Sequence, residues 1–143
     1  MADALEPQES PGLLLWRTTL SWQRLMTSTL KPLGLTHVQF VLLASTWWLN
    51  HVAGESPTQR RIADHANTDP MMTSQVLRTL TTKGFLTRNP DPTDSRAIRV
   101  TVTPVGAALA ERAVKLVEQA DNTFFAPVPD HKALLAALHT LGE

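Results

Sequence analysis

Two dipeptides, Asp69-Pro70 and Thr103-Pro104, constrain the fold of this chain more than any other feature of its sequence. Asp and Thr side chains cap the first backbone amides of a helix, and proline suits the first helical position. Each dipeptide therefore predicts the start of a helix. The first of these helices should end near Lys83, because the next residue, Gly84, is typical of a helix end.

Between these two helices, residues 85–103 change from helical to alternating periodicity. Ile98, Val100 and Val102 alternate with polar residues, which is typical of a strand, and residues 85–87 have the composition of a strand start. The intervening sequence RNPDPTDSR is rich in Pro, Asp and Asn. We therefore expect a β-hairpin whose tip is formed by this polar stretch.

Apolar spacing predicts four further helices, and the helix that starts at Pro104 should reach about Phe125. The four are expected at residues 13–30, 37–50, 59–66 and 131–141. Thr36 and Thr58 are candidate caps for the second and third of them. The helix at 37–50 is apolar on nearly all sides, so we expect it to be the buried one.

The expected order is helix, helix, short helix, helix, β-hairpin, long helix, helix. A short helix, a tight turn at residues 67–68, a second helix and a hairpin together make a winged helix-turn-helix. We therefore predict a mostly α fold with a small β-hairpin wing. A winged helix-turn-helix core at residues 35–103 would be flanked by helices at 12–34 and 104–143, after a flexible N-terminus at 1–11.

Charge is unevenly distributed although the formal net charge of the chain is zero. Residues 56–103 contain seven basic and four acidic side chains, and this basic centre is the asymmetry expected of a segment that meets phosphates. No apolar run reaches the roughly 20 residues needed to cross a bilayer, and the first 11 residues do not resemble a signal peptide. We therefore expect a cytoplasmic protein without a membrane partner. The absence of Cys excludes disulfides and thiol chemistry.

The predicted helix at 70–83 has one face suited to DNA bases. At about 100° per residue, its inner side carries Met72, Thr73, Val76, Leu77 and Leu80. Its outer side has no acidic residue, and Gln and Arg can bond bidentately to adenine and guanine. An ordinary solvated face would mix Glu with Lys. The candidate DNA contacts on this helix are Met71, Thr73, Ser74, Gln75, Arg78, Thr79 and Thr82.

The hairpin and the short helix supply further candidates. Arg88 and Arg96 flank the expected tip, where an Arg can enter the minor groove, and Asp94 is close enough to Arg96 to pair with it or orient it. The simpler interpretation is a solvated loop with a weak local ion pair. The wing candidates are Arg88, Asp94, Ser95 and Arg96, and those on the short helix are Thr58, Gln59 and Arg60.

Residues 35–106 resemble the MarR family of bacterial regulators. The most specific match is DSRAIRVTVTPVG at 94–106, which is similar to the family's wing motif. Further matches are Leu35-Thr36 with Gln39-Phe40, Ile62-Ala63, and LTTKGFLTR at residues 80–88. The family often has Arg at the position of Gln75 and a basic residue at that of Thr79, so we expect a changed operator sequence.

The resemblance implies a homodimer in which the first and last helices of both subunits interleave as dimerisation helices. The two recognition helices would enter successive major grooves of a pseudo-palindromic double-stranded operator. It also implies repression that is relieved by a small aromatic or anionic effector. The candidate effector pocket consists of aromatic and histidine side chains, with core packing as the alternative role of the tryptophans: Trp16, His37, Trp47, Trp48 and His51.

Other kinds of site receive little support from the sequence. His37 and His51 lie 14 residues apart on one helix, or about 21 Å, too far to share a metal ion. No Gly-rich phosphate loop, nucleophile elbow or paired-acid motif indicates an enzyme, so no cofactor is expected. The competing hypotheses are a winged-helix protein-interaction module that no longer binds DNA, and an architectural DNA binder without an effector.

Overall fold

Capping side chains set the helix starts in the computed structural model, which describes residues 6–142. Thr36, Thr58, Asp69 and Thr103 each accept a hydrogen bond from a backbone N–H in the first helical turn, as predicted. The helices are α1 (Pro11–Leu30), α2 (His37–His51), α3 (Gln59–Ala66), α4 (Pro70–Thr82), α5 (Pro104–Phe125) and α6 (His131–Gly142). Two 3-10 turns, Pro7–Glu9 and Lys31–Leu33, flank α1.

The N-terminal expectation needs correction. Residues 7–9 form a 3-10 turn, and α1 already begins at Pro11 with Ser10 as its N-cap, within the stretch that we expected to be flexible up to residue 11. Residues 1–5 of that stretch lie outside the described part of the chain.

The hairpin consists of β1 (Leu86–Pro90) and β2 (Ile98–Val102), which pair antiparallel. Leu86 pairs with Val102 and Arg88 with Val100, so these four side chains occupy one face of the hairpin. Three of them, Leu86, Val100 and Val102, are buried. The strand β1 runs three residues further than the sequence suggested, so the tip is confined to residues 91–97.

The core forms around α2, as its apolar sequence predicted. Leu42, Leu43 and Leu49 of α2 are fully buried and belong to the same cluster as residues from α3, α4, β1 and β2. The other large apolar side chains that are fully buried in this cluster are Met26, Leu30, Ile62, Leu77, Leu80, Leu86 and Val100. The fold is thus mostly helical with a two-stranded wing.

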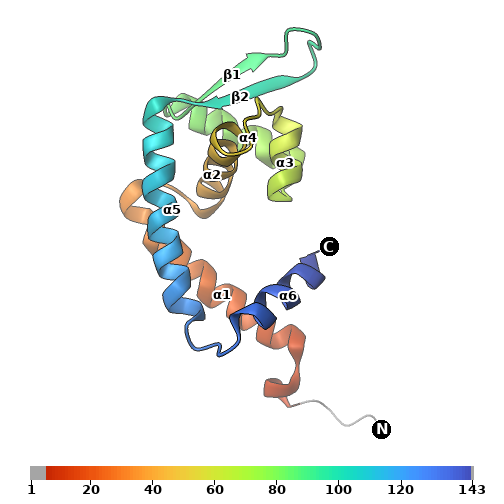
Figure 1. Ribbon diagram of the computed structural model, residues 1–143, viewed down its shortest axis with the longest axis vertical. Coiled ribbons are helices and arrows are strands. Elements are labelled where there is room, and N and C mark those ends of the chain that lie inside the picture. The colour runs from red at the N-terminus through yellow and green to blue at the C-terminus, as the bar shows by residue number, and fades with distance from the viewer. Residues whose placement is uncertain (1–5, 143) are drawn as a thin grey trace.

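The elements divide between two ends of the molecule (Figure 1). The helices α2, α3 and α4 and the hairpin gather at one end, and α5 descends from the hairpin alongside α1 toward the other end, where α6 lies. The chain therefore carries its short-helix, turn, helix and wing unit at a distance from α6. No helix within residues 6–142 has the length and hydropathy required to span a bilayer.

Candidate nucleic-acid interface

The outward face of α4 is polar and free of acidic side chains. Asp69 accepts from Met72 N at 2.9 Å, and a Schellman pair of hydrogen bonds, Gly84 N to Thr81 O and Phe85 N to Leu80 O, ends the helix. Leu77 and Leu80 are fully buried on the inner side. Five of the seven candidates on this helix are exposed and Ser74 is half-buried, the exposed five being Met71, Gln75, Arg78, Thr79 and Thr82.

Thr73 is the exception, and its assignment as a DNA contact was wrong. Its side chain is buried, with 1% of the residue exposed. Its Oγ1 atom lies 2.6 Å from Thr68 Oγ1 in a hydrogen bond that joins the turn after α3 to the first turn of α4. Thr73 therefore fixes the angle between the two helices.

We had expected Arg88 to flank the hairpin tip, but it does not. It lies within β1 on the same face as the buried Leu86, because alternate residues of a strand share a face. Its Nε donates to Gln59 Oε1 of α3 at 2.8 Å. Burial of the guanidinium, with a contribution from the nearby charge of Arg78, lowers the pKa of Arg88 below its ordinary value.

The hairpin tip is built around Asp91, which the sequence reasoning had missed. The Asp91 carboxylate accepts hydrogen bonds from Thr93 N at 2.8 Å, Thr93 Oγ1 at 2.9 Å and Asp94 N at 3.2 Å. Arg99 Nε donates to its other oxygen at 2.6 Å. These bonds, those from Thr93 first, hold the pKa of Asp91 far below its ordinary value. The charge pattern at residues 91 and 99 was visible, but the hairpin register was needed to bring them together.

The base of the wing is attached to α2 and to the segment before α3. Val102 N donates to Asn50 Oδ1 at 2.9 Å, and Val100 N donates to Pro57 O at 2.9 Å. Arg99 Nη1 also donates to Ser56 O. The hairpin is therefore fixed at its base to α2 and to the segment that leads into α3.

At the tip, Asp94 orients the backbone and forms no ion pair with Arg96. The Asp94 carboxylate accepts from the backbone N–H of Arg96 at 3.0 Å. The Arg96 and Ser95 side chains are exposed. Asp94 thus holds the backbone at Arg96, and its hydrogen bond does not involve the guanidinium.

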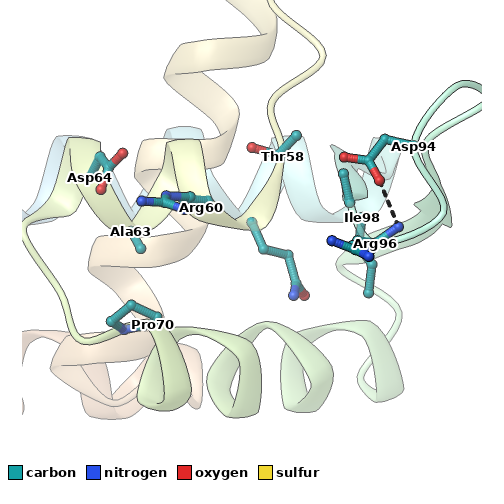
Figure 2. A pocket seen from close by; sticks show the side chains of 10 residues that line it. Thr58, Arg60, Ala63, Asp64, Pro70, Asp94, Arg96 and Ile98 are labelled. Carbon is teal, nitrogen blue, oxygen red and sulfur yellow. Dashed lines mark hydrogen bonds between the residues drawn. The ribbon is translucent and has the colours of Figure 1, made fainter.

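A cleft of about 610 Å³ lies between α3, the start of α4 and the hairpin. Arg60 and Arg96 approach it from α3 and from the hairpin, above Pro70 at the start of α4 (Figure 2). Asp64 and Asp94 are the acidic side chains in its lining, Gln59 and Ala63 of α3 line it as well, and so does Thr58, the N-cap of that helix. Thr58 is half-buried and its Oγ1 is used as the cap of α3.

The ion pairs in the described part of the chain leave several guanidiniums near this cleft without a carboxylate partner. Within residues 6–142, ion pairs join Arg61 to Glu55 at 3.2 Å and Arg99 to Asp91 at 2.6 Å. In the same part of the chain, four guanidiniums around the cleft and α4 have no carboxylate partner, namely those of Arg60, Arg78, Arg88 and Arg96.

The five residues predicted to line an effector pocket do not come together in the chain. Trp16 is 63% exposed on α1, whereas His37 and His51 occupy opposite ends of α2. Trp47 stacks on His51 with ring centroids 6.0 Å apart, and Trp48 stacks instead on His65 of α3. The indole Nε1 of Trp47 is buried and has no hydrogen-bond partner among the described residues. Membership of one helix did not predict which of these side chains meet, because His37 and His51 lie at opposite ends of α2.

His37 belongs to a junction of three helices. Its ring packs edge-on against Trp22 of α1 at a centroid distance of 4.9 Å, and Trp22 Nε1 donates to Asp121 Oδ1 of α5 at 2.8 Å. Burial lowers the pKa of His37, and the charge of Asp121 partly offsets that shift. No cluster of three or more His, Asp or Glu side chains in residues 6–142 is placed to hold a metal ion.

A short helix, a turn, an exposed polar helix and a wing fixed beside it define a winged helix-turn-helix protein. A model of the MarR family matches residues 35–98. An HTH-type transcriptional regulator of Bacillus subtilis is 41% identical over 136 residues, which cover 94% of this chain and 91% of that protein. This chain therefore belongs to the MarR family of transcriptional regulators, as its sequence indicated.

Two further comparisons agree with this assignment. An HTH-type transcriptional repressor of Mycobacterium tuberculosis is 31% identical over 136 residues, covering 92% of this chain and 93% of that protein. A mutant MarR from Escherichia coli, solved in complex with operator DNA, superposes with a TM-score of 0.77 at 26% identity. That alignment covers 96% of this chain and 97% of the other.

Proposed function

We propose that this protein is a homodimeric, sequence-specific DNA-binding repressor that a small molecule releases from its operator. The observation that carries the proposal is the outward face of α4, which exposes Gln75 and Arg78 without an acidic neighbour. The operator-bound MarR, which shares the fold, and the repressor from Mycobacterium tuberculosis give this proposal further support.

The wing and α3 would hold the DNA backbone beside α4. Arg60 and Arg96 approach one cleft, and neither has a carboxylate partner within residues 6–142. Phosphate contacts of this kind position a protein on DNA, whereas base contacts give specificity. In this proposal Arg96 serves the backbone or the minor groove, and residues 35–103 form the DNA-binding lobe.

The apolar surface of α6 supports the homodimer. All three of Leu135, Leu138 and Leu141 are exposed, at 58%, 48% and 75%, and no residue of α6 up to Gly142 is buried. Leu14, Leu15 and Trp16 of α1 are exposed as well. An amphipathic helix needs an apolar partner, and a second copy of residues 12–34 and 104–143 would provide it.

The effector would bind near Trp47. A buried indole N–H without an acceptor is costly unless a ligand or water supplies one, and Trp47 also stacks on His51. A planar aromatic carboxylate can both accept this hydrogen bond and pack beside the rings. Trp47→Phe should therefore weaken release of DNA by a panel of benzoate derivatives while the affinity for DNA itself is kept.

Fluorescence anisotropy on DNA flanking the protein's own gene tests the proposal. Specific duplexes should bind with an affinity that falls steeply with salt, and Arg60→Ala should reduce the salt slope by about one. Arg61→Ala is the matched control, because Glu55 already neutralises that neighbouring guanidinium. If the protein bound no duplex and its association with other molecules were insensitive to salt, a protein-interaction module would be favoured. DNA binding that no small molecule alters would favour an architectural DNA binder.

A further inference from the structure

Two threonine hydroxyls on the outward face of α4 are turned back onto the helix. Thr79 Oγ1 donates to Gln75 O at 3.2 Å, and Thr82 Oγ1 donates to Arg78 O at 3.1 Å. Both residues are exposed. Because a hydroxyl has a single hydrogen, neither side chain retains a donor for DNA. Each offers its methyl group and the remaining lone pairs of its oxygen.

The opposite end of the same face carries another apolar group. Met71 is 83% exposed in the first turn of α4. Residues 71, 75, 78 and 82 follow helical spacing, so Met71 and Thr82 bracket Gln75 and Arg78 along one row. At 1.5 Å per residue this row is about 16 Å long, which corresponds to about five stacked base pairs.

We propose that Met71, Thr79 and Thr82 determine specificity by contacting thymine C5-methyl groups on either side of the base pairs met by Gln75 and Arg78. This inference rests on the proposed function. The thymine methyl is the one apolar group in the major-groove pattern of the bases, and a threonine methyl is a suitable partner for it. The half-site would thus place thymines at both ends of the recognition helix.

Uracil substitution tests the inference directly, since it removes only the C5-methyl and keeps base pairing. The probe is a duplex selected from a random library by the full-length wild-type protein. Uracil in place of thymine at positions that face α4 should lower affinity about fourfold per methyl, and elsewhere should have no effect. If every uracil-substituted duplex bound as tightly as the thymine duplex, this inference alone would be overturned. Failure to select any duplex would overturn the proposed function with it.

Paired substitutions identify the side chain that makes the contact. Thr82→Ser removes the methyl, so it should lose about fourfold in affinity and become insensitive to uracil at one position. Thr82→Val keeps the methyl and should retain both the affinity and the sensitivity. Thr81→Ser is the control, because Thr81 is half-buried and bonded to Leu77 O at 2.8 Å. Loss of affinity in the Val variant with none in the Ser variant would overturn the proposal.

Discussion

Gly106 joins the recognition unit to the long helix α5. A Cβ atom at this position would lie 2.0 Å from the carbonyl oxygen of Phe85, and that oxygen already accepts a hydrogen bond from Thr103 N at 3.0 Å. Thr103 Oγ1 accepts from Gly106 N and donates to Gly84 O. The absence of a side chain therefore allows the start of α5 to contact the end of α4 closely.

Gly106→Ala should destabilise the fold by about 1–3 kcal/mol, because the backbone must shift to relieve the clash. The free energy of unfolding from urea titration measures this effect. Gly12→Ala is the control, since a Cβ there has no neighbour within 4 Å. That variant should be as stable as the wild type or about 0.5–1 kcal/mol more stable. Equal stability of the two variants would contradict the role given to Gly106.

The lowered pKa of His37 predicts how stability depends on pH. Folding disfavours the protonated ring, so the unfolded chain binds the proton more readily, with an ordinary pKa of 6.5. The contribution of His37 is complete above that pH and is lost as pH falls from 6.5 toward the folded-state pKa. Relative to His37→Gln, the wild type should therefore lose stability between pH 7.5 and about 5. A parallel dependence in both proteins, followed by urea unfolding, would contradict this prediction.

Residue-level prediction from sequence succeeded where the partner was a neighbour in the chain. The caps at Thr36, Thr58, Asp69 and Thr103 use backbone amides three residues ahead, so local composition was sufficient. It failed for Thr73, which was named as a DNA contact although the helix wheel placed it on the inner side with Leu77 and Leu80. Only the path of the turn before α4 showed that Thr68 would cover it.

Among the elements, the wing depends on one buried carboxylate. Asp91 joins Thr93, Asp94 and Arg99, and Asp91 N donates to Ala97 O at 2.9 Å, so the tip is held on both sides. Removal of this carboxylate would leave Arg99 without its ion pair, and the donors of Thr93 and Asp94 without their acceptor.

Asp91→Ala should loosen residues 91–97 and weaken binding to all duplexes alike, because Arg96 would no longer be held near the DNA. Faster amide exchange at the tip, with an unchanged base preference, is the expected result. Thr101→Ala serves as the control, since Thr101 is exposed on the hairpin and is not a candidate DNA contact. Unaltered exchange at the tip of the Asp91 variant would show that the network does not hold the wing.

The existence and order of the elements could be predicted, whereas contacts between elements could not. Alternation at Ile98, Val100 and Val102 specified β2, but β1 has a single aliphatic residue and its extent followed only from pairing. Gln59 and Arg88 are 29 residues apart, and no local pattern indicates their hydrogen bond. Among the effector candidates, Trp47 and His51 stack on each other, whereas Trp48 stacks on His65 of α3, a pairing that no local pattern indicates.

At the scale of the whole molecule, the proposed dimer explains why α6 presents leucines to solvent. Leu135 and Leu138 line an apolar depression together with His139 and Gly142. Leu138→Asp should convert the dimer to a monomer, because a buried unpaired carboxylate opposes association. Sedimentation equilibrium measures the change. Met71→Asp is the control, since Met71 is exposed outside the proposed dimerisation helices and an acidic residue in the first turn of α4 is tolerated, and loss of the dimer in both variants would contradict the assignment.

DNA-binding anisotropy with an Arg78→Ala, Arg96→Ala double variant tests the central claim most directly. The probe is the duplex selected by the wild-type protein, and circular dichroism establishes that the variant is folded. Loss of Arg78 should decrease affinity by about 1–3 kcal/mol and relax base preference, and loss of Arg96 should weaken binding to every sequence. The account predicts that the double variant binds this duplex much more weakly and distinguishes it less well from a scrambled one than the wild type does. Full-strength, sequence-specific binding by the double variant would contradict it.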